Sequence, residues 1–310
     1  MTLRLRLLSL LLGMFFSVVQ LVAQTFTGNP NTTFSSQTLQ KYFKQFEVYQ
    51  LDVTGFDAYV KSTPNLSQSE LHLGNHHWNL QLTPSEIIGA NYTVQVSSDD
   101  GLQVLMPNAN KAFKGSETTS GGHVRLTIDT DFVHGFVNAT DGTYYVEPLW
   151  YYEPSAAHDL FVVNEQGQVI HTDVKGACGL TEAEEKAHQL LHDVGDLEDL
   201  EKTAQGCYQL ELAIASDNSM FIKYGSVAGV ENHNIAVINN VQGDYTGNFN
   251  HDIEFNIVTQ FIVTGTDPWT GSTNPGTLLG SFRNGGNGGG VGGRFGNGEL
   301  WANRDFDGDG

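Results

Sequence analysis

Cysteine and basic residues are both scarce in this sequence. It holds only two cysteines, Cys178 and Cys207, among 310 residues. A scaffold held together by several disulfides is therefore excluded, and stability must come from a packed core. Fifteen lysines and arginines stand against 35 aspartates and glutamates, a formal net charge of −20. Phosphate groups would repel such a chain, which argues against nucleic-acid partners and anionic membrane surfaces.

Long hydrophobic runs are scarce as well, because only residues 7–23 approach the length of a membrane span. Arg4 and Arg6 precede this run, and the small Ala23 stands before Gln24 at a plausible cleavage point. The pattern predicts a signal peptide over residues 1–24 and a secreted protein without stable membrane association after cleavage. A single-span anchor is the alternative.

What the sequence does hold is a long stretch of strand-like alternation between residues 42 and 169, as in 78–82, 92–96, 123–128 and 144–149. Turn signals such as Asp100-Gly101 and Asp141-Gly142 separate these segments. We expect an antiparallel sandwich or barrel here. Residues 25–41, rich in Ser, Thr and Asn, are expected to form a loose arm.

The pattern changes after residue 180. Residues 180–206 predict an acidic helix or helical linker, and residues 208–215 predict a buried strand. Asp217 is placed to cap a long helical pattern that runs through residues 227–241, and a strand over 251–263 and a helix near 278–282 follow. Alternating strands and helices indicate an α/β layer, with a domain boundary near residues 200–207.

Several segments of residues 208–310 resemble, in order and spacing, the reprolysin (adamalysin-type) metzincin proteases: QLELAIASD (209–217), VINNV (237–241), DPWT (267–270), LLGSFRN (278–284) and LWANRDFDG (300–308). Upstream, FKG (113–115), GHVRLTI (122–128) and YVEPL (145–149) resemble the propeptide of that family. Near its end, KGACG (175–179) is similar to a cysteine switch, in which Cys178 would be an inhibitory zinc ligand. A disulfide between Cys178 and Cys207 is the alternative.

The resemblance implies an α+β protein in four parts. These are a signal peptide (1–24), a β-rich propeptide built as an antiparallel sandwich or barrel (25–177), a cysteine-switch and acidic helical linker (178–206), and the N-terminal part of an α/β metzincin catalytic domain (207–310). It also implies a secreted zinc metalloendopeptidase zymogen, which would use a zinc-activated water to hydrolyse a peptide or protein substrate.

No H-E-x-x-H zinc motif occurs in the 310 residues. We therefore expect the Zn²⁺ ligands beyond residue 310, assign no catalytic residue, and expect a front portion of a longer precursor that is inactive alone. Ca²⁺ is a further expectation, with Glu211 as a family-like ligand and Asp305, Asp307 and Asp309 as half of a calcium loop.

Two rival interpretations remain open. One is a non-catalytic secreted β-domain that serves as an adhesion or binding module, with a calcium-binding tail. The other is a truncated pseudoenzyme that binds or inhibits a relative. A histidine triad in the following reading frame would favour the peptidase, whereas repeated D-x-D-x-D-G would favour the calcium module.

Overall fold

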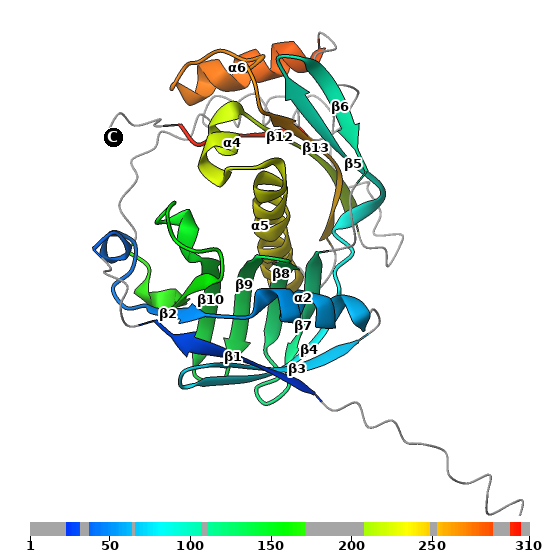
Figure 1. Ribbon diagram of the computed structural model, residues 1–310. Helices are drawn as coiled ribbons and strands as arrows, with labels where there is room; N and C mark the ends of the chain where they lie inside the picture. The colour runs from blue at the N-terminus through cyan, green and yellow to red at the C-terminus, as the bar shows by residue number, and fades with distance from the viewer. Residues whose placement is uncertain are drawn as a thin grey trace, which may run out of the picture.

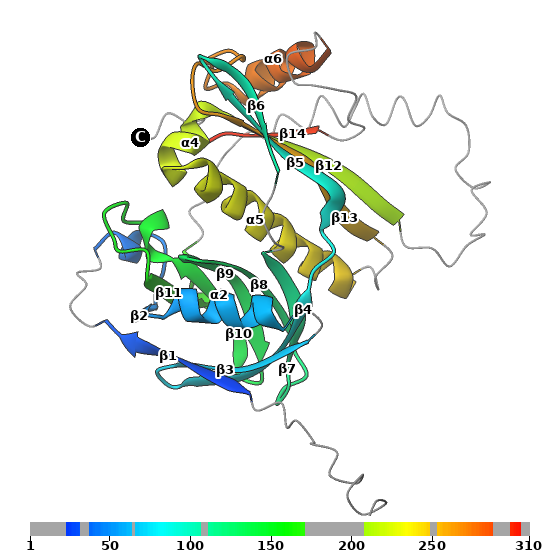
Figure 2. The same cartoon turned by 45° about the vertical axis from the view of Figure 1, so that its right-hand side comes forward.

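The computed structural model describes residues 23–31, 37–63, 66–106, 111–170, 208–248, 253–287 and 298–304. These residues form a closed barrel and an open sheet, with the long helix α5 (Val227–Asn248) between them (Figures 1 and 2). Helix α6 (Pro275–Asn287) covers the face of the open sheet that points away from α5. The order of the layers is therefore barrel, α5, sheet and α6.

The barrel has nine strands in the order β1-β2-β11-β10-β9-β8-β7-β4-β3. Adjacent strands are antiparallel, except that β1 and β3 are parallel and close the ring. The strands are β1 (Gln24–Pro30), β2 (Glu47–Gln50), β3 (Ser67–Leu73), β4 (His76–Pro84), β7 (Ala112–Glu117), β8 (His123–Asp129), β9 (Phe132–Ala139), β10 (Gly142–Pro148) and β11 (Leu160–Glu165).

Alternation along these strands places apolar side chains inside the barrel. Helix α2 (Val53–Ser62) adds Val53, Phe56 and Val60 to the same core, and the Asp52 side chain caps it by accepting a hydrogen bond from the amide of Gly55. Gly135 in β9 has φ 156°, and a side chain there would overlap the carbonyl oxygen of Arg125 on β8. Three short 3₁₀ turns complete the barrel unit: η1 (Leu39–Lys41), η2 (Leu149–Tyr151) and η3 (Gln166–Gln168).

The open sheet has the order β14-β12-β13-β5-β6. Its strands are β5 (Ile88–Ser98), β6 (Gly101–Leu105), β12 (Tyr208–Ser216), β13 (Ile253–Val263) and β14 (Gly298–Trp301). Strands β5, β13, β12 and β14 are parallel to their neighbours, and β6 is antiparallel to β5. Parallel strands need crossovers, which α5 and α6 supply on opposite faces of the sheet.

The two faces of the open sheet have separate apolar cores. Leu212, Ile214 and Ile257 pack with α5 on one face, together with Val94 and Val96 of β5. Ala215, Phe261, Val263 and Trp269 pack with Leu278 and Phe282 of α6 on the other. Burial on both faces explains the nearly continuous apolar run in β12, which the sequence correctly predicts as a buried strand.

The predicted fold class is wrong. The described part of the chain is mostly β and contains a closed nine-stranded barrel, so it is not an α+β protein that ends in an α/β metzincin catalytic domain. The open sheet is also not formed by residues 207–310 alone, because β5 and β6 come from the segment assigned to the propeptide. Sequence periodicity predicted β5 but not β6, and it could not show with which sheet β5 pairs.

The loose arm predicted for residues 25–41 is wrong as well, because β1 lies there and closes the barrel. The boundaries predicted at residues 177–178 and 206–207, and the acidic helical linker between them, lie outside the described residues. In the described part, no helix is both long enough and apolar enough to span a bilayer.

Candidate functional site

A cavity of about 690 Å³ lies at the outer edge of the open sheet, where β14 ends. Helix α4 (Asn218–Tyr224) forms one wall and α6 forms another, while α5 contributes His233. Its lining residues are mostly apolar: Met220, Lys223, Tyr224, His233, Pro275, Leu278, Leu279, Leu300, Trp301, Ala302 and Asn303. Among the described strands, β14 pairs with β12 alone, so its second edge borders this cavity.

The chain reaches the cavity through a capped helix. As predicted, Asp217 caps the helical region, because its Oδ1 accepts a hydrogen bond from the amide of Met220 at 3.2 Å. The cap belongs to the short α4 rather than to one long helix, since Gly225 adopts a left-handed conformation with φ 72° and ends α4 before α5 begins. This turn places Tyr224 and His233 side by side.

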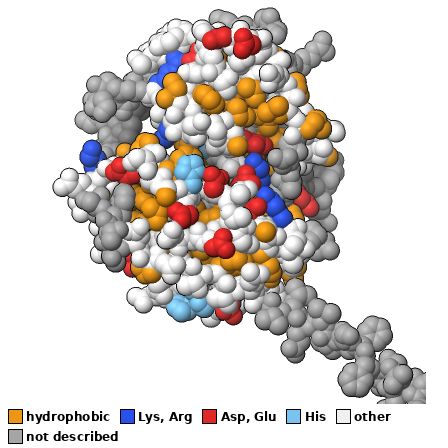
Figure 3. All heavy atoms as spheres, viewed as in Figure 1, with side chains coloured by type: hydrophobic (Ala, Val, Ile, Leu, Met, Phe, Trp, Pro, Cys, Tyr) orange, Lys and Arg blue, Asp and Glu red, His pale blue; other side chains and the backbone are white. Residues whose placement is uncertain are grey.

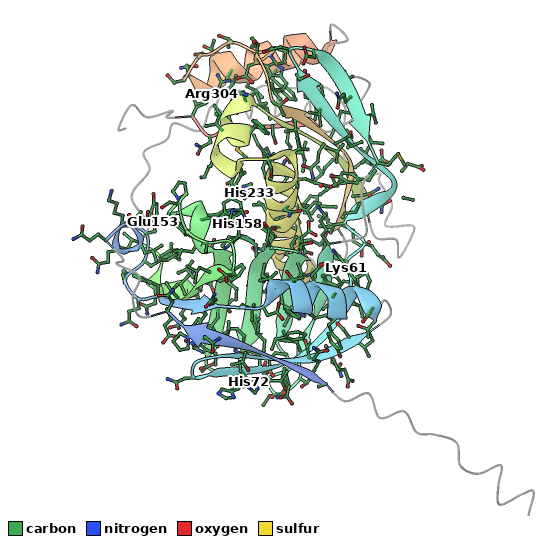
Figure 4. All side chains as sticks on the ribbon, in the orientation of Figure 1. Lys61, His72, Glu153, His158, His233 and Arg304 are labelled. Carbon is green, nitrogen blue, oxygen red and sulfur yellow. The ribbon has the colours of Figure 1, made fainter. Side chains whose placement is uncertain are left out.

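Arg304 fixes the end of β14 against α4 (Figure 4). Its Nε donates to Asp217 Oδ2 at 2.6 Å and its Nη2 donates to Asp267 Oδ2 at 3.0 Å. Nη1 donates to the carbonyl oxygens of Thr270 and Ser272. Burial raises the pKa of Asp267 and the Asp217 charge adds to the rise, although the amide of Asn218 and Arg304 oppose it. With its donors used in this way, Arg304 is a structural clamp.

His233 is the central polar group at the cavity (Figure 4). Its Nδ1 lies 3.1 Å from the hydroxyl of Tyr151, and its Nε2 lies 3.1 Å from the hydroxyl of Tyr224, whose ring stacks on the imidazole. Burial, then His134 and Lys223, lower the pKa of His233 well below its usual value. The imidazole is therefore neutral at pH 7, and both nitrogens are already hydrogen-bonded.

This bonding limits the chemistry of His233. A neutral imidazole has one donor and one acceptor nitrogen, and the two phenols use both. Burial also raises the pKa of Tyr151 and Tyr224, so neither phenol ionises near neutrality. The imidazole cannot bind a metal through either nitrogen without losing a hydrogen bond to a tyrosine. The mostly apolar lining of the cavity suits an apolar or aromatic group.

A second cleft, of about 630 Å³, lies beside the barrel and is more polar. Asp52, Asp131, His158 and Asp159 line it, and His158 Nδ1 lies 2.7 Å from Asp131 Oδ2. In Figure 3 histidine and acidic side chains gather in the middle of the visible face, whereas hydrophobic side chains gather above them over the open sheet. The acidic groups have internal partners, since Asp52 caps α2 and Asp159 accepts from Gln50 at 2.6 Å.

The described part of the chain contains no cluster of side chains that could serve as one of the predicted metal sites. No group of three or more His, Cys, Asp or Glu side chains is arranged there to hold an ion. Glu211 lies exposed on β12, opposite Asn256 of β13.

Cys178, Cys207, Asp305, Asp307 and Asp309 lie outside the described residues. Their assigned roles, like that of Glu211, stay predictions. The sequence interpretation missed His233, Tyr151 and the clamp formed by Arg304. Only the presence of Arg304 within a family-like segment could have drawn attention to it, and nothing in the spacing of Tyr151, Tyr224 and His233 indicates that they meet.

The comparisons with known proteins give likenesses to solved structures only. No family model matches the chain, and no curated protein matches it. Among solved structures, the crystal structure of metalloproteinase-II from Bacteroides fragilis is similar at 13% identity with a TM-score of 0.35. The match covers 74% of this chain and 62% of that one, so this chain spans less than two thirds of its length. A likeness at this level does not establish a shared activity, and what it adds is that a metalloproteinase is among the distant structural neighbours.

Proposed function

We propose that this chain belongs to a secreted zinc metallopeptidase precursor, whose zinc ligands lie outside the 310 residues. The protease-like segments of residues 208–310 and the cysteine-switch-like segment at Cys178 support this. The described part then serves to position peptide and to maintain latency, and it does not carry out hydrolysis.

The observation that carries the proposal is the second edge of β14 beside the apolar cavity. Backbone N–H and C=O groups at a strand edge pair with an extended peptide, and pockets beside the edge select its side chains. The walls formed by Tyr224, Leu278 and Trp301 suit an apolar side chain. A peptidase needs its substrate extended along such an edge, so the described geometry matches the binding half of that task.

The test uses the complete precursor from the natural reading frame. We expect one equivalent of zinc by metal analysis, and peptide hydrolysis after proteolytic activation that a chelator abolishes and zinc restores. Cys178→Ser should raise the activity of the uncut precursor, whereas Cys207→Ser, the matched control, should not. Hydrolysis that survives chelation would contradict the proposal, and so would a precursor that binds no zinc. A disulfide between the two cysteines would end the switch role of Cys178.

A further inference from the structure

The hairpin formed by β5 and β6 is an insertion in the chain between two barrel strands, and it projects away from the barrel as an arm. It leaves the barrel after β4 and returns at β7, yet β4 and β7 pair directly with each other. The barrel is therefore closed without the arm. Figure 2 shows the arm rising from the barrel past α5 to the open sheet, where β5 lies along β13.

The arm completes a sheet that belongs mainly to the other end of the chain. From Thr93 to Ser97, successive residues of β5 pair with β13 from Thr259 to Val263. The amide of Thr264 donates to the carbonyl oxygen of Ser97 at 2.8 Å, and the amide of Thr266 donates to Asp99 Oδ1 at 2.8 Å. The chains approach closely here, since a Cβ on Gly265 would lie 2.7 Å from the amide nitrogen of Asp99.

The arm is also fixed to α5. Val94, Val96 and Tyr92 are buried in the apolar core between the sheet and this helix. The hydroxyl of Tyr92 donates to Glu231 Oε1 at 3.1 Å. Beside it, Lys111 Nζ contacts Glu231 Oε2 at 3.2 Å and Asn232 Oδ1 at 2.8 Å. Both backbone pairing and buried side chains thus bind the arm to α5 and β13.

None of these contacts uses residues between 170 and 208. We propose that a cut in that stretch leaves the N-terminal unit (residues 23–170) bound to the C-terminal unit (residues 208–304), with the arm as the main attachment beside the hydrogen bonds between β8 and α5. The surface on the C-terminal unit is the edge of β13 together with the adjoining face of α5. Its partner is the arm, which supplies a parallel strand with Tyr92, Val94 and Val96 on one face.

Release of the arm would uncover both a strand edge and part of an apolar core. A bare β13 edge would expose unpaired backbone groups and the apolar core beneath them, so release of the arm opens the sheet. Where the proposed function holds, latency would outlast the first cut, and activity would need a second event that frees the arm. This consequence rests on the proposed function, but binding of the two units does not.

The test is a cut in the intact chain. A recognition sequence for a site-specific protease is placed within residues 171–207, the folded protein is cut, and the products are separated by gel filtration without denaturant. We expect both fragments in one peak at the elution volume of uncut protein. Two separate peaks, or precipitation of either fragment, would overturn the proposal. The readout needs no peptidase activity, so its failure is distinguishable from failure of the proposed function.

Matched variants test whether the arm is what keeps the two units together after the cut. Val94 is 2% exposed and Val104 is 58% exposed, although both lie on the arm. After cutting, Val94→Asp should separate into two peaks and Val104→Asp should remain in one. Gly265→Ala places the perturbation on the other unit and should also weaken retention. If the cut Val94→Asp and Gly265→Ala proteins both stay as one peak, the arm is not the main attachment between the units. Separation of the cut Val104→Asp protein into two peaks would also contradict the proposal.

Discussion

The two faces of strand β8 differ in chemistry, although both are buried. Val124, Leu126 and Ile128 point into the barrel and are fully buried among apolar side chains. Arg125 and Thr127 point outward to α5 and are also buried, at 7% and 0% exposure. Arg125 Nη2 donates to Thr246 Oγ1 at 3.2 Å, and Thr127 is 3.5 Å from the side-chain nitrogen of Asn239. One strand therefore serves an apolar core and a polar interface.

The contrast between the two faces of β8 shows how the two units are joined. Apolar burial inside the barrel is not directional and tolerates small shifts. Hydrogen bonds between β8 and α5 have fixed geometry, and a displaced helix would leave buried polar groups unpaired. The barrel interior thus stabilises the unit itself, whereas the outer face of β8 sets the position of α5. Interfaces between domains of one chain are commonly more polar than domain cores, as here.

The strongest test of the polar interface is Lys111→Met. Lys111 Nζ lies 2.9 Å from Asp129 Oδ2 and 3.2 Å from Glu231 Oε2, and its side chain is 7% exposed. Without it two carboxylates stay in a buried site, so we expect the free energy of unfolding to fall by about 3–5 kcal/mol. Urea denaturation measures this change.

The control is Lys61→Met, because Lys61 also contacts Asp129, at 3.3 Å, and Asp57, at 2.6 Å, but its side chain is 27% exposed. Solvent screens these pairs more than those of Lys111, so their removal should cost less, about 1 kcal/mol. Equal losses in the two variants would show that burial does not distinguish the interface from the surface, and the comparison would fail.

The matching test of the barrel interior is Leu126→Ala. This side chain is fully buried in the apolar core, so truncation should lower the free energy of unfolding by about 2–5 kcal/mol through lost contacts and a cavity. Leu102→Ala on β6, where the side chain is 55% exposed, should change it by less than about 0.5 kcal/mol. Thermal or urea unfolding gives both values. A loss at Leu126 no larger than at Leu102 would mean that the interior is not the stabilising core.

How much of this the sequence could predict depends on the range of the interactions. Period-two alternation predicted β4, β5, β8 and β10, because apolar side chains alternate along each of these strands and face an apolar core. It could not place β5, since the partner strand β13 is distant in sequence and parallel to it. β1 was missed because its polar composition is that of a loop, while burial of Phe26 depends on β3.

The candidate site was less predictable than the fold. Asp217 was identified as a helix cap because capping is local and has a sequence signature. The contact of His233 with Tyr151 joins α5 to η2 across the interface between the units. No local pattern encodes such a contact, and the neutral state of His233 follows from burial that only the fold supplies.

The smallest expected effect concerns pH and separates the two faces of β8 again. Burial alone would raise the pKa of Asp129, but Lys111, Asn232 and the amide of Thr130 outweigh it and lower the pKa to about 2. Because the folded pKa lies below the unfolded value, this group stabilises the fold above about pH 4 and loses that contribution as pH falls toward about 2. The loss should be about 2 kcal/mol.

Urea unfolding at several pH values in this window should therefore show a steeper decline for the wild type than for Asp129→Asn. Leu126→Ala, which removes no titratable group, should keep the wild-type slope with a lower free energy at every pH. A wild-type slope in Asp129→Asn would place the acid sensitivity elsewhere and remove the electrostatic part of the contrast between the barrel interior and its outer face.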